Sequence, residues 1–222
     1  MGEAIGQVIG LAVGIAISPV PIAAVILMMF SGRARANSAA FMVAWIAGIA
    51  VVTTVVTLIP GLEADDGEPG TAAGWVKLVL GLLLVLVALR QWRSRPQAGD
   101  EPELPGWMAR IDTMKSGAAF GLGFLLSAVN PKNLLLGIAA GAAIGSAGLA
   151  GGEIAVVITA FTLLAAVTVI VPVVGFLLAG DRMDRTLDAT KDWLIRNNSV
   201  VMAVLLVVLG VNLLGDGISI LS

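Results

Sequence analysis

The sequence contains no cysteine and no histidine, and few of its residues are charged. Without cysteine it can form no disulfide and has no thiolate nucleophile, and without both residue types the usual zinc sites are excluded. The most common general acid–base side chain of enzymes is absent as well. The net charge of −2 does not predict nucleic-acid binding. We therefore expect no enzymatic activity, no metal, no cofactor and no nucleic-acid partner.

Apolar residues are what the sequence has in excess. They make up 58% of the chain, and charged residues make up 13%, whereas an average soluble domain has about 45–50% and about 25%. A soluble globule of 222 residues has too little interior to bury so much apolar surface. The apolar residues form continuous runs, not the alternating pattern of a transmembrane β-barrel. The sequence therefore predicts an all-α polytopic membrane protein.

Six stretches are apolar enough to cross a membrane, which takes about 20 residues. The third reaches full length if Lys77 and Arg90 extend to opposite membrane interfaces. The fourth is one long span that is interrupted by Lys132. The predicted spans are approximately 5–30, 38–60, 74–92, 117–148, 154–179 and 198–220.

The basic residues are distributed unevenly between the loops. Of the 13 Lys and Arg residues, eleven lie in the first, third and fifth loops, whereas the second loop is acidic between residues 63 and 68. Cytoplasmic loops carry the excess of Lys and Arg. We therefore predict a multi-pass protein of the plasma (cytoplasmic) membrane with both termini outside.

A linker divides the chain nearly in half. Residues 94–106 contain three prolines and no long apolar run, which predicts a cytoplasmic linker. The domains on either side are residues 1–93 and 107–222, each with three spans. Apolar residues recur at helical spacing among charged ones in 107–114 and 181–196. This pattern predicts two short interfacial helices.

The two halves share a pattern. Pro19 and Pro21 interrupt the first span and Pro131 interrupts the fourth, while the third and sixth spans share Leu80–Gly81 and Leu209–Gly210. Because each half has an odd number of spans, the second must enter the membrane upside down. The sequence therefore predicts two inverted three-helix repeats, the plan of many transporters, with broken first and fourth helices.

The prolines predict two helix breaks inside the membrane. Proline lacks an N–H and its ring clashes with the preceding turn, so we expect each helix to stop and to resume near Ile22 and Leu134. Non-helical backbone at membrane depth is tolerated where it is buried in protein or lines a cavity. Each resuming half-helix also directs an N-terminus to the centre, and helix N-termini attract anions.

Lys132 is the one charged residue deep in a predicted span. Insertion scales put its cost at about 2.5–3.5 kcal/mol, and backbone carbonyls, water or an anionic substrate group could offset that cost. We predict a central anion site; the alternative is a structural kink with Lys132 snorkelling or lying in a subunit interface. The predicted substrate-binding residues here are Ser18, Pro19, Pro21, Asn130, Pro131, Lys132 and Asn133.

Four further polar residues complete the candidate substrate-binding set: Thr53, Thr54 and Thr57 in the second span and Asn212 in the sixth. The alternative for the threonines is a hydrogen bond to their own helix, and for Asn212 a contact between helices. Glycines recur every four residues in the first and fourth spans. Small residues at this spacing let helices approach closely, so a homodimer is a further expectation.

These motifs resemble those of the LysE superfamily of six-helix exporters, and within it the GAP family of glycopeptidolipid- and sulfolipid-addressing, Sap-like proteins. The resemblance spans the chain and rests on Ser18–Ile22, Asn130–Leu134 and the Lys77…Leu80–Leu83 pattern. Amino-acid exporters of the superfamily typically have glycine where this chain has Ser18, which favours the GAP branch. The resemblance implies transport of anionic or glycosylated lipids to the cell envelope.

The expected function is therefore a transporter that moves a lipid or glycolipid with an anionic head group towards the outer envelope. Alternating access around the central site would move the head group, while the acyl chains remain among the membrane lipids. One alternative is an exporter of a small solute such as an amino acid. The other is an accessory subunit of an envelope-lipid export machinery.

Overall fold

The computed structural model describes residues 2–59, 64–65, 68–69, 71–94, 111, 113–179 and 184–221. Within these ranges the chain forms eight α-helices, one π-helical turn and two short strands that pair antiparallel. The elements are α1 (Gly2–Ala16), α2 (Pro19–Met29), α3 (Ala34–Thr57), β1 (Ala64–Asp65), β2 (Glu68–Pro69), α4 (Thr71–Arg93), α5 (Ser116–Phe124), the π-helical turn η2 (Leu125–Val129), α6 (Pro131–Gly145), α7 (Gly151–Ala179) and α8 (Asp184–Leu221).

Several of these helices are long and apolar enough to cross a membrane, as in a multi-pass membrane protein. Helices α3, α4 and α7 meet this condition singly. Helix α1 with α2, and α5–η2 with α6, form two bent pairs with angles of 53° and 59° at the break. The predicted broken first and fourth helices are therefore present. The described residues supply up to five spans, so the predicted count of six is not confirmed; the apolar part of α8, Leu206–Leu221, is shorter.

The second half of each bent pair begins at a proline. Helix α2 begins at Pro19 and α6 at Pro131, so the predicted starts near Ile22 and Leu134 are wrong by three residues. Proline is favoured at the first helical position because the N–H that it lacks would have no partner there and its φ already suits the helix. Each proline thus ends one half-helix and starts the next.

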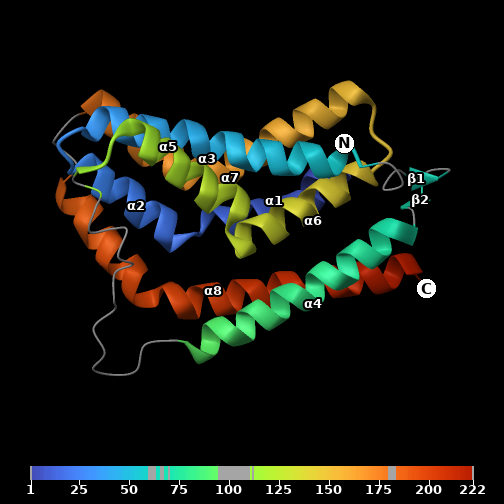
Figure 1. Cartoon of the computed structure of the whole chain (residues 1–222). Coiled ribbons are helices and arrows are strands. Elements are labelled where there is room, and N and C mark those ends of the chain that lie inside the picture. The colour runs from blue at the N-terminus through green and yellow to red at the C-terminus, as the bar shows by residue number, and fades with distance from the viewer. Residues whose placement is uncertain are drawn as a thin grey trace.

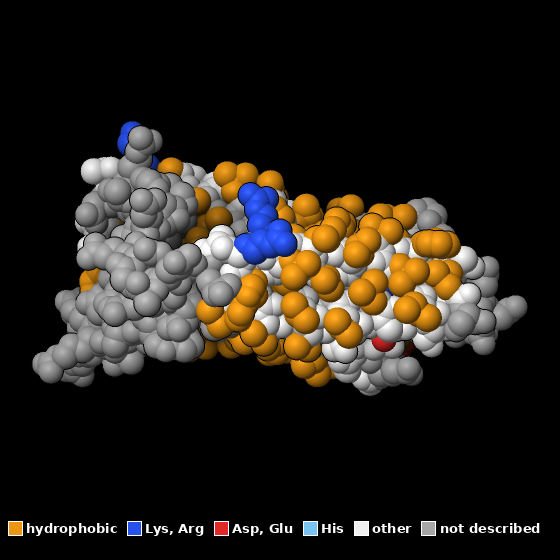
Figure 2. Space-filling model, turned by 90° about the horizontal axis from the view of Figure 1, so that it is seen from below, with side chains coloured by type: hydrophobic (Ala, Val, Ile, Leu, Met, Phe, Trp, Pro, Cys, Tyr) orange, Lys and Arg blue, Asp and Glu red, His pale blue; other side chains and the backbone are white. Residues whose placement is uncertain are grey.

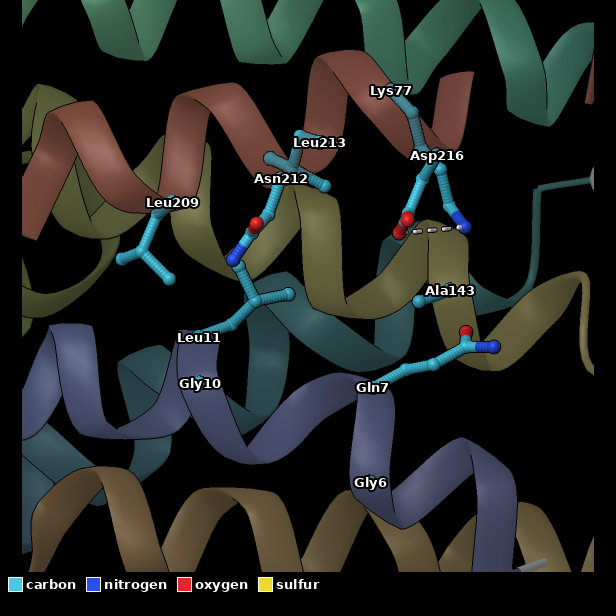
Figure 3. A pocket seen from close by; sticks show the side chains of 10 residues that line it. All are labelled: Gly6, Gln7, Gly10, Leu11, Lys77, Ala143, Leu209, Asn212, Leu213 and Asp216. Carbon is cyan, nitrogen blue, oxygen red and sulfur yellow. Dashed lines mark ion pairs between the residues drawn. The ribbon is translucent and has the colours of Figure 1, made fainter. Parts of the chain in front are cut away.

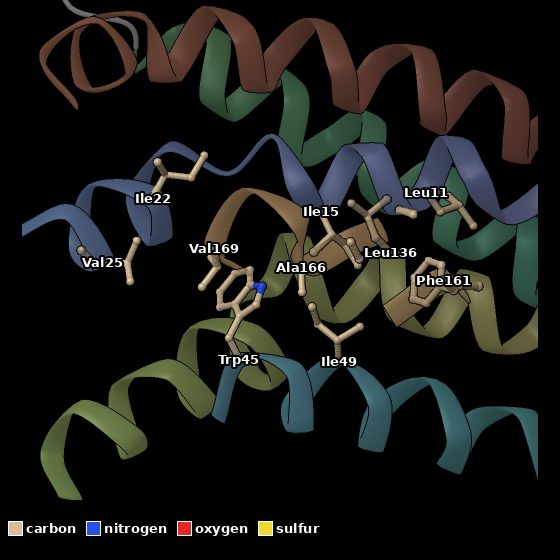
Figure 4. Packing of buried hydrophobic residues seen from close by; sticks show 14 of the residues in the cluster. Leu11, Ile15, Ile22, Val25, Trp45, Ile49, Leu136, Phe161, Ala166 and Val169 are labelled. Atoms are coloured by element: carbon tan, nitrogen blue, oxygen red, sulfur yellow. The ribbon is translucent and has the colours of Figure 1, made fainter. Parts of the chain in front are cut away.

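Helices α1, α3, α5, α6 and α7 pack into one body, in which α1 contacts α6 and α7, and α3 contacts α5, α6 and α7 (Figure 1). Figure 4 shows Trp45 and Ile49 of α3 directed towards α7, from which Ala166 and Phe161 project. Both large aromatic side chains are 1% exposed. Inside a membrane such contacts stabilise by close packing, because lipid tails are as apolar as the side chains.

Helices α4 and α8 form a second body and lie side by side along the lower edge of Figure 1. A Cβ atom on Gly81 would lie 2.8 Å from the carbonyl oxygen of Gly210, and one on Gly210 would lie 2.9 Å from the carbonyl oxygen of Gly81. A Cβ on Gly217 would lie 3.0 Å from the carbonyl oxygen of Gly74. Only glycine allows the two backbones to approach this closely.

The face that α4 and α8 turn away from the first body is apolar apart from one group of Lys and Arg side chains (Figure 2). Its exposed side chains include Trp75, Leu82 and Leu86 of α4 and Val204 and Val211 of α8. Soluble proteins rarely expose a continuous apolar surface of this kind. The face therefore suits contact with lipid tails.

Helix α8 covers the predicted interfacial segment at 181–196 from Asp184 onward and continues without interruption to Leu221. Figure 1 shows a change of direction between its orange and red parts. Helical structure is therefore found there, and the interfacial position stays a prediction. Most of the linker and most of the predicted helix at 107–114 lie outside the described residues. The domain division stays a prediction as well.

The glycine pattern serves packing inside the chain at some positions. A Cβ on Gly141 would lie 2.8 Å from the carbonyl oxygen of Thr53, which places α6 tightly against α3. At Gly2, Gly117 and Gly121 an added Cβ would meet nothing within 4 Å. The expected homodimer stays a prediction.

Candidate functional site

The break between α1 and α2 leaves carbonyl oxygens at the end of α1 without helical partners, and Lys132 bonds them. Its Nζ lies 2.8 Å from the oxygen of Gly14 and 3.5 Å from that of Ile17, and it also donates to Oγ of Ser18. Lys132 is the second residue of α6. The two broken helices, more than 100 residues apart in sequence, are therefore joined at their breaks.

This contact explains how the protein accommodates a buried lysine. Lys132 is 9% exposed, and a buried ammonium needs hydrogen-bond partners and compensating charge. The C-terminal end of a helix carries a partial negative charge of about half an electron, and the end of α1 supplies it. Backbone carbonyls, one of the three compensations that the sequence leaves open, therefore bond the ammonium.

Asparagine side chains bond the remaining backbone groups at the second break. The Asn130 side chain accepts a 3.1 Å hydrogen bond from the backbone N–H of Lys132, which caps α6. The Asn133 amide donates to the carbonyl oxygen of Leu126 in η2 at 2.8 Å, and its oxygen lies 3.4 Å from Oγ of Ser18. Both asparagines therefore bond backbone groups that the break frees.

A pocket of about 540 Å³ opens at these breaks. It lies between the N-terminal ends of α2 and α6 on one side and α4 and α8 on the other. Six of the seven residues predicted around Lys132 line it. The seventh, Asn133, does not line the pocket but accepts a hydrogen bond from Ser18, which does. The full lining is Ser18, Pro19, Val20, Pro21, Val87, Arg90, Gln91, Ser94, Asn130, Pro131, Lys132 and Leu206.

The described lining of this pocket is positive. It contains the cations Arg90 and Lys132 and no carboxylate, and Arg90 is exposed. Both half-helix N-termini open onto it, although Pro19 and Pro21 lack an N–H, so Val20 alone offers a backbone donor within the first three residues of α2. Cations and a helix N-terminus together favour an anionic ligand.

The predicted threonines lie away from this pocket. The hydroxyl of Thr57 lies 2.8 Å from the carbonyl oxygen of Thr53 in its own helix and 3.2 Å from that of Gly141 in α6. Thr53 is fully buried and its hydroxyl finds no partner among the described atoms. Thr54 is half-buried. The three side chains are not among the pocket's lining residues, and their role in binding stays a prediction.

The structure adds contacts that the sequence patterns do not predict. The sequence places Arg90 only at the end of a span, although a cation one turn from a helix end is a reasonable candidate for a site residue. Thr168 of α7 donates a 2.6 Å hydrogen bond to the carbonyl oxygen of Ala16, a contact that no local pattern reveals. Lys77 was expected to reach the interface, but it is 4% exposed and pairs with Asp216 at 3.7 Å.

Comparison with known proteins gives one match. The model of a family described as Sap, sulfolipid-1-addressing protein, matches residues 8–219, a range that contains every residue of the pocket. No curated protein and no solved structure matches the chain.

Proposed function

The chain belongs to the Sap, sulfolipid-1-addressing protein, family, and we propose that it moves a lipid or glycolipid with an anionic head group across the plasma membrane towards the outer envelope. The family description names a sulfolipid, a lipid whose head group carries a negatively charged sulfur group. The observation that carries the proposal is the pocket at the breaks, with two cations and no carboxylate in its described lining. Transport is thus the activity proposed, and catalysis is not.

The head group binds between Arg90 and the two helix breaks. Arg90 is the exposed cation of the pocket and Lys132 the buried one, so Arg90 meets the anion first, and guanidinium bonds sulfate-like groups through several N–H donors. Ser18 and Asn130 offer hydrogen bonds for sugar hydroxyls at the breaks. The acyl chains stay outside, along the apolar face of α4 and α8 (Figure 2).

Lys132 couples binding to movement of α1. Its present partner at 2.8 Å is the neutral carbonyl of Gly14, and an anionic oxygen is a stronger acceptor. A Cβ on Gly14 would lie 2.6 Å from Leu209 of α8 and 3.1 Å from Leu136 of α6, so this glycine is where three helices close on one another. An anion that replaces the Gly14 carbonyl as the partner of Lys132 loosens the end of α1, where it packs against Leu209 and Leu136.

We further propose that the chain consists of two inverted three-helix repeats that rock against each other. The bends of 53° and 59° lie at corresponding places in the two halves. The equivalent glycines, Gly81 and Gly210, lie against each other's carbonyl oxygens. With both chain termini outside the membrane, Arg90 faces the cytoplasm, where the loops rich in Lys and Arg also lie.

A vesicle assay tests the proposal with a defined sulfated glycolipid. The full chain is reconstituted into phosphatidylcholine vesicles that contain fluorescently labelled sulfatide (3-O-sulfogalactosylceramide), and an external quencher reports the lipid that reaches the outer leaflet. We expect faster transfer than in protein-free vesicles, and no acceleration with labelled galactosylceramide, which lacks the sulfate. A wild-type chain that transfers neither lipid overturns the proposal and favours an accessory subunit.

Substitutions connect that activity to the pocket. Lys132→Met and Arg90→Gln should each lower the transfer rate about tenfold or more, the size of a lost charge-assisted hydrogen bond. Lys115→Gln is the matched control, because Lys115 is an exposed cation outside the pocket. Arg90 is exposed as well, so its variant separates binding from folding. Unchanged transfer in both pocket variants contradicts the anion site.

A further inference from the structure

A second pocket of about 540 Å³ lies nearer the end of the molecule that carries both chain termini (Figure 1). Its polar lining residues are Gln7 of α1, Lys77 of α4, and Asn212 and Asp216 of α8. Figure 3 shows Lys77 and Asp216 directed from their helices into the space above α1, with Gln7 across from them. Lys77 among them is buried, whereas Gln7, Asn212 and Asp216 are exposed. Inside a membrane, polar side chains are costly without a polar ligand, water or one another.

Among the described residues, the ammonium of Lys77 has hydrogen-bonding capacity that is not used. Its side chain is 5% exposed, and the one polar partner found for it there is Asp216, in an ion pair of 3.7 Å. That distance is longer than a hydrogen bond, and an ammonium has three donors. A buried cation with donors left over, at the wall of a cavity, is arranged to bind an additional acceptor.

The two pockets share three helices. Helices α4, α6 and α8 contribute residues to both, whereas the bent pair lines the first pocket with α2 and the second with α1. On α8, Leu206 lines the first pocket and Leu209 the second, within one turn of each other. Between them Gly14 lies against Leu209 and Leu136. In the first bent pair this glycine therefore lies between the residues that line the second pocket, up to Leu11, and those that line the first, from Ser18.

We propose that the two pockets are the ends of one path that is closed at Gly14, and that the second pocket is a further binding site for the same anionic, hydroxylated head group where the lipid leaves. This inference rests on the proposed transport function. Lys77 bonds the anionic oxygen of the head group in place of Asp216, and Gln7 and Asn212 bond its hydroxyls. A carboxylate beside two amides suits a sugar and disfavours a bare inorganic anion, because Asp216 would repel it. Because Asp216 competes with the head group for Lys77, the affinity of this pocket for the lipid stays low, and a low affinity lets the lipid leave.

The test measures protection of a single cysteine, since the natural chain has none. Gly6→Cys places a thiol on the pocket wall at a position with open space around it. Gly117→Cys is the matched control, because Gly117 is also exposed and open but does not line the pocket. The full-length chain in detergent is labelled with a maleimide while sulfatide or galactosylceramide is added. We expect sulfatide alone to slow labelling, and only at Gly6→Cys.

Charge variants in the Gly6→Cys background decide the role of the ion pair. Asp216→Asn frees Lys77 and should lower the half-protecting sulfatide concentration about tenfold. Lys77→Met should raise it about tenfold or more, and Lys77→Arg should restore protection. Opposite shifts support the site, because a purely structural ion pair would weaken in the same way from either side. Shifts in the same direction, no shift, or equal protection of Gly117→Cys overturn it.

The two proposals fail separately. If the wild-type chain does not transfer sulfatide in vesicles but shows the opposite shifts in protection, the transport function is wrong and the second site stands. If it transfers sulfatide while labelling at Gly6→Cys does not respond to the lipid, the second site alone is wrong.

Discussion

The ammonium of Lys132 donates a 2.8 Å hydrogen bond to the carbonyl oxygen of Gly14, which lies 118 positions earlier in the sequence. The same glycine lies against Leu209, so that an added Cβ would come within 2.6 Å of its side chain. One residue of a broken helix thus meets both the buried cation of α6 and a leucine that lines the second pocket. Four predictions follow from this packing and from the predicted orientation.

Gly14→Ala should destabilise the closure between the pockets. The new methyl group must displace Leu209, and overpacking of this kind costs about 1–3 kcal/mol of unfolding free energy. Thermal unfolding in detergent measures the loss. Gly2→Ala is the control on the same helix, where nothing lies within 4 Å. Equal stability of the two variants would show that Leu209 does not close on Gly14.

Gly210→Ala should separate α4 from α8. An added Cβ would lie 2.8 Å from Cγ2 of Val85 and 2.9 Å from the carbonyl oxygen of Gly81, and a backbone atom cannot move aside as a side chain can. We expect a loss of about 1–3 kcal/mol, read from unfolding in mixed micelles. Gly215→Ala, on the same helix with open space, should be neutral or slightly stabilising because alanine favours helix. A reversed order would contradict the packing of α4 on α8.

Thr168→Val should lower the unfolding free energy by removing a contact at the first helix break. The substitution keeps the shape of the side chain and removes the 2.6 Å hydrogen bond to Ala16, at a cost of about 1 kcal/mol. Thr159→Val is matched to it, because Thr159 is exposed and bonds Ala155 in its own helix at 2.7 Å. That variant should change stability little. The difference between the two melting curves is the quantity of interest.

Single cysteines test the predicted orientation. Gly32→Cys lies between α2 and α3 and Gly151→Cys at the start of α7, both at exposed positions with open space. The excess of Lys and Arg in the odd-numbered loops predicts that the first faces the cytoplasm and the second the outside. A membrane-impermeant maleimide added to intact cells should therefore label Gly151→Cys alone. Labelling of Gly32→Cys alone would reverse the topology.

Much of this architecture can be derived from the sequence. Long apolar runs predict membrane helices because an unpaired backbone group inside lipid is too costly, and prolines predict breaks because they lack an N–H. The same property of proline predicts helix starts near Ile22 and Leu134, which is three residues too late. A proline also starts a helix well, so α2 and α6 begin at Pro19 and Pro131. Half of the residues that line the pocket at the breaks follow from the same local reasoning.

The sequence by itself determined which helices break, that a lysine lies at one break, and that positive charge gathers towards one end of the spans. These are local properties of composition and backbone geometry. Only the tertiary structure decided that Lys132 bonds Gly14 and that Arg90 lines the same pocket as Lys132. It also decided that Lys77 pairs with Asp216 at the second pocket. Such contacts depend on which helix faces pack together, and on glycines that let backbones approach, so no spacing along the chain encodes them.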